Sequence, residues 1–452
     1  MPDELLKNSN FPKFYSVLIA LFALTIFAGQ YYISRENFSY LVCWQVLLHF
    51  VFIFLYQKRG EISLRQILFA AIVLRVGSAF ISPSLSDDVY RFIWDGQLII
   101  DGQNPLVSTP DEYLKTLNSS DLNYTYLIKL HSSINHPQFY TCYPPVMQAV
   151  FTIAAFLGGS SIFTSIILIK VILAIADCFA IVFVTKLLKK LNADVKSVIL
   201  YAFNPLVIIE GAGNAHFEVM QLLFVVMSIY FILENKYNLA ASIWGLAIDT
   251  KLLPLLLLPL LLRYVGFKKG VVFSAIAVGV AVVLFVPFIA TGSVEGFAKS
   301  LNLYFQNFEF NASIYYLARE VGWWLKGFNY ISFIGPFLMC IFLAVYAVIF
   351  FIKKKIPFFE FGLYALIILS LYYLFATTVH PWYIINMLPF AFIANRKYPF
   401  VWMGMAFLSY NAYGNINFKE NFYILALEYF VVLLAMYYSF RKQISTAAIE
   451  SR

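Results

Sequence analysis

Charged residues are scarce in this chain, in which only 12% of the 452 residues are Asp, Glu, Lys or Arg. That share is about half of what soluble domains carry, whereas 61% of the residues are apolar. A water-soluble fold could not bury so much apolar surface, so the composition excludes a soluble protein. Apolar blocks of about 15 to 25 residues recur from Phe14 to Phe440, close to the length that crosses a bilayer. The chain is therefore predicted to be an all-α membrane protein.

Sequence motifs of soluble enzymes are also missing. There is no Gly-rich phosphate loop, no zinc-ligand spacing and no Ser-His-Asp arrangement. Only Cys142 of the four cysteines lies outside the apolar blocks, so no disulfide or metal framework is predicted. The formal charge of +8 does not indicate nucleic acid as a partner, because Lys and Arg stand in short clusters between apolar blocks. Since there is no internal repeat or linker, residues 1–452 are expected to form a single integral membrane domain with no separate soluble domain.

The lengths of the apolar blocks predict about 13 to 14 transmembrane helices. Their expected ranges lie near residues 14–32, 38–56, 66–81, 162–188, 197–210, 214–233, 239–250, 251–263, 270–290, 329–352, 359–378, 381–394, 398–412 and 421–440. Polar residues and Gly interrupt these helices at 204–218 and at 249–251. Such breaks persist inside a membrane only where protein or a water-filled cavity satisfies the freed backbone groups.

Residues 82–161 are mostly polar and form one large loop between predicted spans. The apolar stretch 146–158 inside this loop is too short to cross comfortably, so it is predicted to be an interfacial helix. With that assignment, about two thirds of the Lys and Arg residues fall on one side of the membrane, which is then the cytoplasmic side. Both termini are therefore expected in the cytoplasm, and the loop 82–161 is expected to be extracytoplasmic.

The loop opens with a charged cluster, in which Ser86, Asp87 and Asp88 are followed by Arg91 and Asp95. If this segment is helical, Ser86 is a suitable N-cap, and Asp88, Arg91 and Asp95 share one face. Two adjacent carboxylates beside a low-dielectric membrane suit a general base that takes a proton from a hydroxyl, with Arg91 keeping one of them ionised. The alternative is that these charges only offset the helix dipole.

Histidines and aromatic residues at the predicted outer face are candidates to bind a sugar or an acceptor. His136 and Tyr143 lie in the large loop and could bind sugar hydroxyls. His380, Trp382 and Tyr383 stand together between two predicted spans. They form either part of the aromatic belt at the membrane interface or a stacking wall for a sugar ring.

Ionisable residues inside apolar blocks are costly, and they usually face a cavity or a partner. The candidates are Arg75, Lys170, Asp177, Glu210, His216, Glu218, Asp249, Lys251, His380 and Glu428. Those expected near the outer helix ends, where they could line one cavity, are Glu210, His216, Glu218, Lys251 and His380. Lys251 and His216 suit the phosphate of a lipid-linked substrate, because a cation is needed where a phosphate leaves. The alternatives are contact with lipid headgroups and an ion pair between Asp249 and Lys251.

These segments resemble the GT-C superfamily of polytopic glycosyltransferases, and within it the bacterial polyprenol-phosphate-mannose-dependent mannosyltransferases. The order and spacing agree with the family for SDDVYRFIWDGQLIIDGQNPL at 86–106, INHPQFYTCYPP at 134–145, FNPLVIIEGAGNAHFE at 203–218, KLLPLLLLP at 251–259 and HPWY at 380–383. One departure is that two full spans precede the one that leads into the acidic loop, whereas many relatives have a single span there. Helix numbers therefore do not transfer from the family.

The resemblance implies a membrane enzyme that transfers a hexose, with mannose expected, from a polyprenyl-phosphate donor to a glycan, lipid or protein acceptor on the outer face. It implies inversion at the anomeric carbon, with Asp87 or Asp88 as the catalytic base. Lys251, with Arg91 or His216, is expected to hold the donor phosphate, and Glu218 joins the candidates that contact the sugar or the acceptor. The activated donor needs no nucleotide. A divalent metal ion is a possible cofactor, because two carboxylates and a phosphate could hold one, and the metal dependence stays open.

A transporter or flippase is the competing class, because it also places ionisable residues in broken helices near a central cavity. Here the polar residues gather at the outer helix ends and in the large loop, which favours the enzyme. A polymerase or ligase of lipid-linked glycans shares the donor class and the topology, and stays open. In each case membrane lipids surround the chain, and the expected location is a bacterial plasma (inner) membrane.

Overall fold

The computed structural model describes residues 13–121, 123–292, 294–306, 308–414 and 418–450 of the chain. The structure is 77% helical, and within these ranges Phe310 and Thr378 form an isolated β-bridge. Seven of the described helices are long and apolar enough to cross a membrane. They are α1 (Lys13–Tyr32), α2 (Phe38–Gln57), α8 (Ile162–Lys190), α14 (Phe267–Ala290), α17 (Ile331–Ile352), α18 (Phe358–Phe375) and α21 (Phe422–Glu450). The prediction of an all-α polytopic membrane protein is confirmed.

The other predicted spans are short or broken helices. The sequence predicted about 13 to 14 spans. The described residues contain seven helices that are long and apolar enough to cross a membrane, or eight if the pair Val195–Ala202 and Pro205–Gly213, bent by 57°, is counted as one. The short helices include α3 (Leu64–Ala79), α11 (Glu218–Leu233), α12 (Tyr237–Thr250), α13 (Leu258–Val265), α19 (Leu388–Ile393) and α20 (Tyr398–Met405). Proline occupies the first or second position of α13, α19 and α20, where the missing N–H ends the preceding hydrogen-bond ladder.

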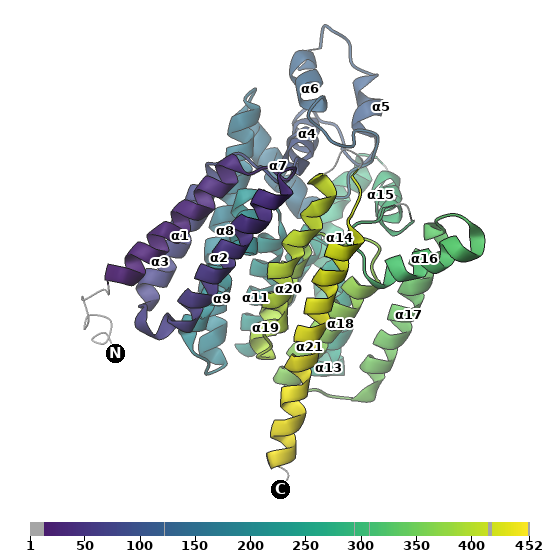
Figure 1. Ribbon diagram of the computed structural model, residues 1–452. Coiled ribbons are helices and arrows are strands. Elements are labelled where there is room, and N and C mark those ends of the chain that lie inside the picture. Colours follow the sequence, from purple (N-terminus) through teal and green to yellow (C-terminus); the bar gives the residue numbers. More distant parts are fainter. Residues whose placement is uncertain (1–12, 122, 293, 307, 415–417, 451–452) are drawn as a thin grey trace.

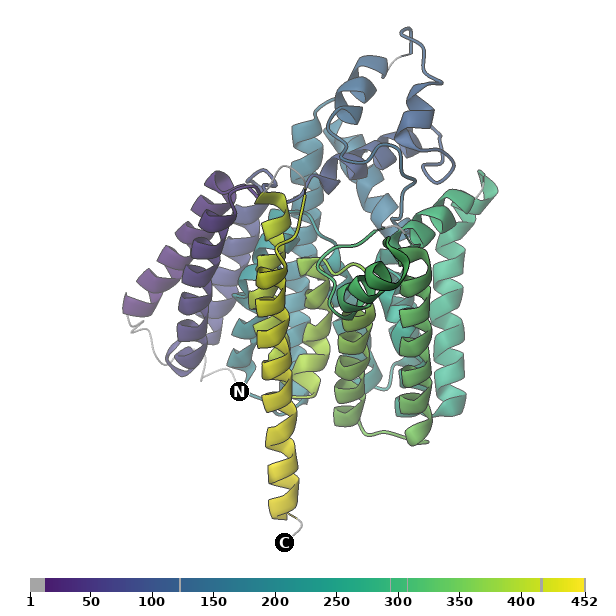
Figure 2. The same cartoon turned by 45° about the vertical axis from the view of Figure 1, so that its right-hand side comes forward.

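The helices form a bundle in which α3, α8, α11, α12 and α14 contact one another in that order. Helices α1 to α3 lie on one side of it, and α14, α17 and α18 lie on the other (Figures 1 and 2). The polar segment with α4 (Asp88–Ile100), α5 (Pro110–Leu114) and α6 (Tyr124–His131) projects from one end of the bundle (Figure 1). Helix α1 begins and α21 ends toward the opposite end (Figure 2).

The predicted helix 146–158 is present as α7 (Pro145–Gly158). Pro144 and Pro145 begin it, because a proline lacks the N–H that the first turn of a helix leaves unpaired. One face of α7 packs against α4 and α8. Its other face exposes Phe156 and Leu157. The apolar segment thus forms a short helix beside the bundle and joins the polar segment to α8.

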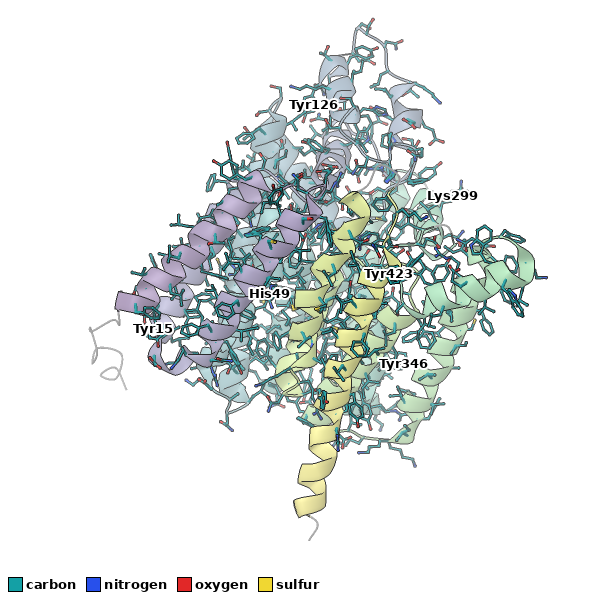
Figure 3. The ribbon with its side chains drawn as sticks, in the orientation of Figure 1. Tyr15, His49, Tyr126, Lys299, Tyr346 and Tyr423 are labelled. Atoms are coloured by element: carbon teal, nitrogen blue, oxygen red, sulfur yellow. The ribbon has the colours of Figure 1, made fainter. Side chains whose placement is uncertain are left out.

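Large apolar side chains cover much of the outside of the bundle. Phe50, Val283 and Phe351 are among those that stay exposed. Tyr423, near the start of α21, is 89% exposed and points away from the bundle (Figure 3). Soluble proteins rarely expose apolar surface on this scale, whereas lipid chains are a favourable surrounding for it. The exposed surface therefore agrees with the confirmed class of membrane protein.

Several of the charged residues inside apolar blocks hold helices together. Arg75 of α3 and Asp177 of α8 form a fully buried ion pair, with 3.0 Å between Nε and Oδ2. The hydroxyl of Tyr201 donates a hydrogen bond of 2.7 Å to the other oxygen of Asp177. Lys170 donates to the backbone oxygen of Ile81, just after α3. Since a buried charge needs such partners, these residues stabilise the packing of α3, α8 and the bent pair.

Candidate active site

A cavity of about 380 Å³ lies where the polar segment meets the end of the bundle. It is formed by the start of α4, the residues before α7, the α11–α12 hairpin, helices α17 and α18, and residues 376–386. Its polar lining includes Asp88, Tyr143, Glu218, Gln221, Lys251, Thr377, Thr378, His380, Trp382, Tyr383 and Asn386. Six residues predicted for the site therefore share one cavity with Asp88: Tyr143, Glu218, Lys251, His380, Trp382 and Tyr383.

The two adjacent aspartates have different surroundings. Asp88 is the first residue of α4 and lines the cavity, and its backbone N–H donates to Ser86 Oγ at 3.3 Å. Asp87 is the N-cap residue of the helix, the place that the sequence predicted for Ser86. Its Oδ2 forms an ion pair with Arg35 and accepts a hydrogen bond of 3.1 Å from Asn135 Nδ2. Asp87 thus joins the α1–α2 loop to the polar segment, while Asp88 faces the cavity.

Burial in the cavity wall raises the pKa of Asp88 to about 6, although the charge of Lys251 lowers it in part. Loss of hydration disfavours the ionised carboxylate, and the neighbouring Asp87 adds to this effect. A carboxylate with a pKa near 6 is still ionised at neutral pH, and it accepts a proton more readily than an ordinary aspartate does. The position and the pKa of Asp88 both suit a general base.

Arg91 points away from the cavity. Its Nε lies 2.8 Å from Asp95 Oδ1, and its Nη1 donates to the backbone oxygen of Phe139 at 2.7 Å. Gln148 of α7 donates to the other oxygen of Asp95 at 3.0 Å. This network fixes α4 against α7 and the loop, so Arg91 lies outside the lining where a donor phosphate was predicted to bind. The cation beside the aspartate pair is Arg35 instead.

Arg35 was not among the residues predicted for the site. It lies in the short α1–α2 connection, and its guanidinium stacks over the ring of Tyr413 at 4.8 Å from the centroid. A sequence signal was available, because Arg35 is a basic residue on the predicted outer side, where few Lys and Arg residues were expected. It pairs with Asp87 across 52 positions of the chain, a contact that only the fold creates.

Lys251 and Glu218 meet because of the hairpin that their helices form. Glu218 is the first residue of α11 and Lys251 follows the last residue of α12, so the two antiparallel helices bring them to the same end. Lys251 Nζ forms an ion pair with Glu218 Oε1 and lies 5.3 Å from the centroid of Tyr383. The ion pair between Asp249 and Lys251, which the sequence left open as an alternative, is absent among the described contacts. Both oxygens of Asp249 are buried without a hydrogen-bond partner in the described part of the chain.

Trp382 lies in the middle of a column of stacked rings. The His216 ring stacks on it with 3.6 Å between centroids, and the His380 ring stacks on its other face at 4.5 Å. Phe310 then stacks on the far face of His380 at 4.9 Å. Both faces of Trp382 are therefore covered, and a sugar in the cavity would meet the edge of this column. His216 lies behind Trp382 and outside the lining, with Nε2 at 3.4 Å from Glu210 Oε2.

The two loop residues predicted to bind sugar hydroxyls differ in position. Tyr143 lines the cavity, with its ring edge-to-face against Phe92 at 4.9 Å. His136 is exposed on the loop beside Phe139, with 5.6 Å between the ring centroids, and it lies outside the lining. The cavity therefore brings Tyr143 to Asp88 but not His136.

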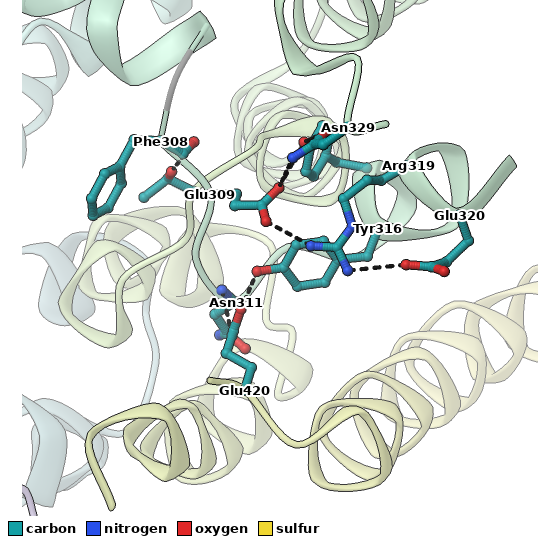
Figure 4. Close-up of polar contacts among 10 residues, drawn as sticks. Phe308, Glu309, Asn311, Tyr316, Arg319, Glu320, Asn329 and Glu420 are labelled. Carbon is teal, nitrogen blue, oxygen red and sulfur yellow. Dashed lines mark hydrogen bonds and ion pairs between the residues drawn. The ribbon is translucent and has the colours of Figure 1, made fainter. Parts of the chain in front are cut away.

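Residues 308–313 form a strap that supports the cavity wall. Phe310 N–H donates to the oxygen of Thr377 at 3.0 Å, and Val379 N–H donates to the oxygen of Phe310 at 2.8 Å. Two carboxylates anchor the strap (Figure 4): Glu309 pairs with Arg319 at 2.6 Å, and Glu420 accepts from the backbone N–H of Asn311 at 2.8 Å. These contacts place Phe310 against His380.

Apolar side chains also line the cavity. Leu252, Leu253 and Leu256 line it just after Lys251, together with Met339 of α17 and Phe375 of α18. The chain turns through a 3-10 segment, Leu253–Leu257, because Pro254 cannot continue α12. One cavity thus holds both charged groups and hydrocarbon, which fits a ligand that is itself amphipathic.

The described residues contain no group of three or more His, Cys, Asp or Glu side chains placed to hold a metal ion. In the cavity, Asp88 and Glu218 share their surroundings with the Lys251 ammonium. An ammonium in such surroundings is a group that can bind a phosphate.

A comparison with protein families matches residues 24–266 to the family model described as Alpha-(1->6)-mannopyranosyltransferase, N-terminal domain. The matched range contains Asp88, Glu218 and Lys251, and it ends before the wall at 376–386. No curated protein and no solved structure matches the chain.

Proposed function

The chain belongs to the alpha-(1->6)-mannopyranosyltransferase family, and on that premise we propose that it transfers mannose from a polyprenyl-phosphate carrier to an acceptor at the extracytoplasmic face. Membership makes the protein a glycosyltransferase that uses a mannose donor and an acceptor. The lipid carrier, the inversion, the aspartate base and the side of the membrane belong to the proposal.

The cavity is the observation that carries the proposal. Asp88 and Lys251 line it together. The charge of the Lys251 ammonium partly offsets the rise in the pKa of Asp88 that burial causes. The apolar part of the lining begins at Leu252, the residue after Lys251. A polyprenyl-phosphate sugar has the same sequence of parts, a hydrocarbon chain, an anionic phosphate and a sugar. Lys251 would hold the phosphate between the leucines and Asp88.

The reaction follows from these positions. Asp88 accepts the proton of an acceptor hydroxyl, whose oxygen attacks the anomeric carbon of mannose while the bond from that carbon to the phosphate oxygen breaks. Lys251 stabilises the negative charge that develops on the departing phosphate. Because an alpha linkage formed with inversion requires a beta-linked donor, the proposal specifies a carrier with mannose in beta linkage. The activated donor makes a nucleotide unnecessary at this step.

Mutating the two aspartates separately tests the proposal. The purified protein in detergent would be incubated with radiolabelled polyprenyl-phosphate mannose and mannosyl acceptors. Asp88→Asn is expected to lower the rate about 10² to 10⁴-fold, the range for a lost general base. Asp87→Asn keeps its place beside Arg35 and Asn135, so its loss is expected to be far smaller.

Asp87→Asn also serves as the control for folding, and the melting temperature of Asp88→Asn is compared with it. Burial disfavours the Asp88 carboxylate, so the isosteric Asn should leave the melting temperature unchanged or higher. Undiminished transfer by Asp88→Asn would rule out this residue as the base. Substrate-driven flux in proteoliposomes, without transfer of any lipid-linked mannose, would instead support the transporter class.

A further inference from the structure

The ion pair between Glu218 and Lys251 is unevenly exposed to the cavity. The side chain of Lys251 is 25% exposed, whereas that of Glu218 is fully buried. One oxygen of Glu218 contacts Lys251, and the other has no hydrogen-bond partner among the described residues. In the described part of the chain, Lys251 is thus the hydrogen-bonding partner on which this buried carboxylate depends.

Lys251 does not depend on Glu218 in the same way. Gln221 Nε2 donates to the backbone oxygen of Lys251 at 2.7 Å, which fixes the main chain at the end of α12. The ammonium also lies against the ring of Tyr383, a favourable surrounding for a cation. Lys251 can therefore exchange one anion for another and stay at the cavity wall, whereas Glu218 cannot replace its cation.

Binding of a phosphate donor changes the charge balance of the cavity. The lining holds the acidic side chains of Asp88 and Glu218 and the basic side chain of Lys251. The phosphodiester of a donor adds one more negative charge. The phosphate and the Glu218 carboxylate then compete for the ammonium of Lys251 in a medium of low dielectric constant. A buried carboxylate that loses its cation is strongly disfavoured unless it becomes neutral.

Resting on the proposed function, we propose that Glu218 is the resident anion of the donor site. The donor phosphate displaces the carboxylate from Lys251, and Glu218 takes up a proton from solvent. When the carrier phosphate leaves, Glu218 releases that proton to solvent and pairs with Lys251 again. No covalent bond to Glu218 forms, so the only change at this residue is one proton gained and lost in each cycle.

Other titratable groups surround Glu218 and bear on this exchange. Asp88 faces it across the cavity, and Glu210 interacts with it from the bent pair. Tyr373 and Tyr383 are the hydroxyl groups that interact with it from α18 and the segment after it. The ion pair that the phosphate breaks is the one between Glu218 and Lys251, so the proposal assigns the proton to Glu218.

The exchange has a consequence for turnover. A carboxylate that competes for Lys251 weakens the binding of the phosphate and helps the carrier to leave after transfer. Replacing it with an amide removes the competitor while preserving the shape of the side chain. Glu218→Gln is therefore expected to bind the donor about tenfold more tightly, to show a lower donor KM and to turn over more slowly because product release becomes limiting.

The test uses the full chain in detergent and farnesyl phosphomannose as the probe, without acceptor. This phosphodiester carries one fixed negative charge, so any proton taken up on binding goes to the protein. Calorimetry in buffers of different protonation enthalpy is expected to show uptake of about one proton by the wild type and none by Glu218→Gln. Asp88→Asn is expected to retain the uptake.

Asp249→Asn is the matched control. It removes a buried carboxylate two positions from Lys251 that lies outside the cavity lining, so affinity and proton uptake should equal those of the wild type. Lys251→Met should weaken binding of the probe both in the wild type and in Glu218→Gln. If Glu218→Gln does not fold, the wild-type titration still decides, because binding without proton uptake contradicts the exchange.

The outcomes separate the inference from the proposed function. Binding that needs Lys251 but is not tightened by Glu218→Gln, or proton uptake that disappears in Asp88→Asn, overturns the role of Glu218 and leaves the donor site intact. No binding of the probe to the wild type or to any variant overturns the proposed donor.

Discussion

Asp87 and Asp88 show how far two neighbouring residues of one type can differ in chemical role. The Asp87 carboxylate is bound by Arg35 and Asn135, so its charge is already used in holding the structure together. Asp88 lines the cavity. The ammonium that interacts with it belongs to Lys251, which is already paired with Glu218. A carboxylate that is not committed to a cation is free to take a proton from a substrate.

The raised pKa of Asp88 gives the reaction a specific pH dependence. The base acts only when ionised, so kcat/KM is expected to be constant at neutral pH and to fall through pH 6, approaching tenfold for each further pH unit. With an aspartate of the ordinary pKa of about 3.9, kcat/KM would stay nearly constant down to about pH 5. Initial rates between pH 4.5 and 8 measure this fall of kcat/KM. A value that stays constant down to pH 4.5 would contradict Asp88 as the base.

At the scale of helices and connecting segments, two contacts determine where Asp88 and the cavity wall lie. Helix α4 approaches α7 so closely that a Cβ on Gly96 would lie 2.4 Å from the backbone oxygen of Phe151. The strap 308–313 places Phe310 on His380 and so fixes the far side of the ring column. The first contact positions the base, and the second positions the wall opposite it.

Gly96→Ala is expected to destabilise the protein by about 1 to 3 kcal/mol, because an added methyl group forces α4 away from backbone atoms that cannot yield. Activity should fall as well, since Asp88 begins the same helix. Thermal unfolding in detergent measures the first effect. Gly279→Ala in α14 is the control: nothing lies within 4 Å of its added Cβ, so that variant should unfold at or above the wild-type temperature.

Glu309→Gln is expected to lower kcat/KM by about tenfold, equivalent to about 1.4 kcal/mol. The change removes the ion pair with Arg319 and weakens the hydrogen bonds that Tyr315 and Asn329 donate to the same carboxylate. Transfer assays at varied donor concentration give the value. Glu320→Gln removes the exposed partner of Arg319 and leaves the strap untouched, so equal losses in the two variants would show that the strap does not position the wall.

At the scale of the whole molecule, the start of α4 lines the cavity. Helices α4, α5 and α6 project from one end of the bundle, and α1 begins and α21 ends toward the other end (Figures 1 and 2). The clusters of Lys and Arg that indicate the cytoplasmic side include residues 353–355, in the connection between α17 and α18. The distribution of charge and the position of the cavity thus agree with a site that opens outward.

Single cysteines in a background without the four native ones test this orientation. A cysteine in place of exposed Asn118, in the polar segment, is expected to react with a membrane-impermeant thiol reagent in intact cells. A cysteine in place of exposed Lys354 should react only after the cells are opened. The reverse pattern would place the cavity on the cytoplasmic side.

The sequence by itself determined the class of fold, because so many apolar residues leave no alternative to a membrane bundle. Block length predicted α1, α2, α8, α14 and α18 to within about three residues, an accuracy expected where long apolar runs are clear. It also predicted α7 as a separate short helix. The residues Asp88, Glu218, Lys251 and Tyr383 were recognised as candidates because charge and aromatic rings at these places are costly or unusual.

Only the tertiary structure decided how those candidates are used. Apolar length could not separate one long helix from short helices broken by proline, so fewer helices are long enough to cross a membrane than the number of spans that the sequence predicted. The partner of each charge depends on contacts between distant parts of the chain: Asp87 with Arg35, Arg91 with Asp95, and Lys251 with Glu218. Stacking of His216 and His380 on Trp382 is likewise a product of the fold, since ring contacts leave no trace in composition or spacing.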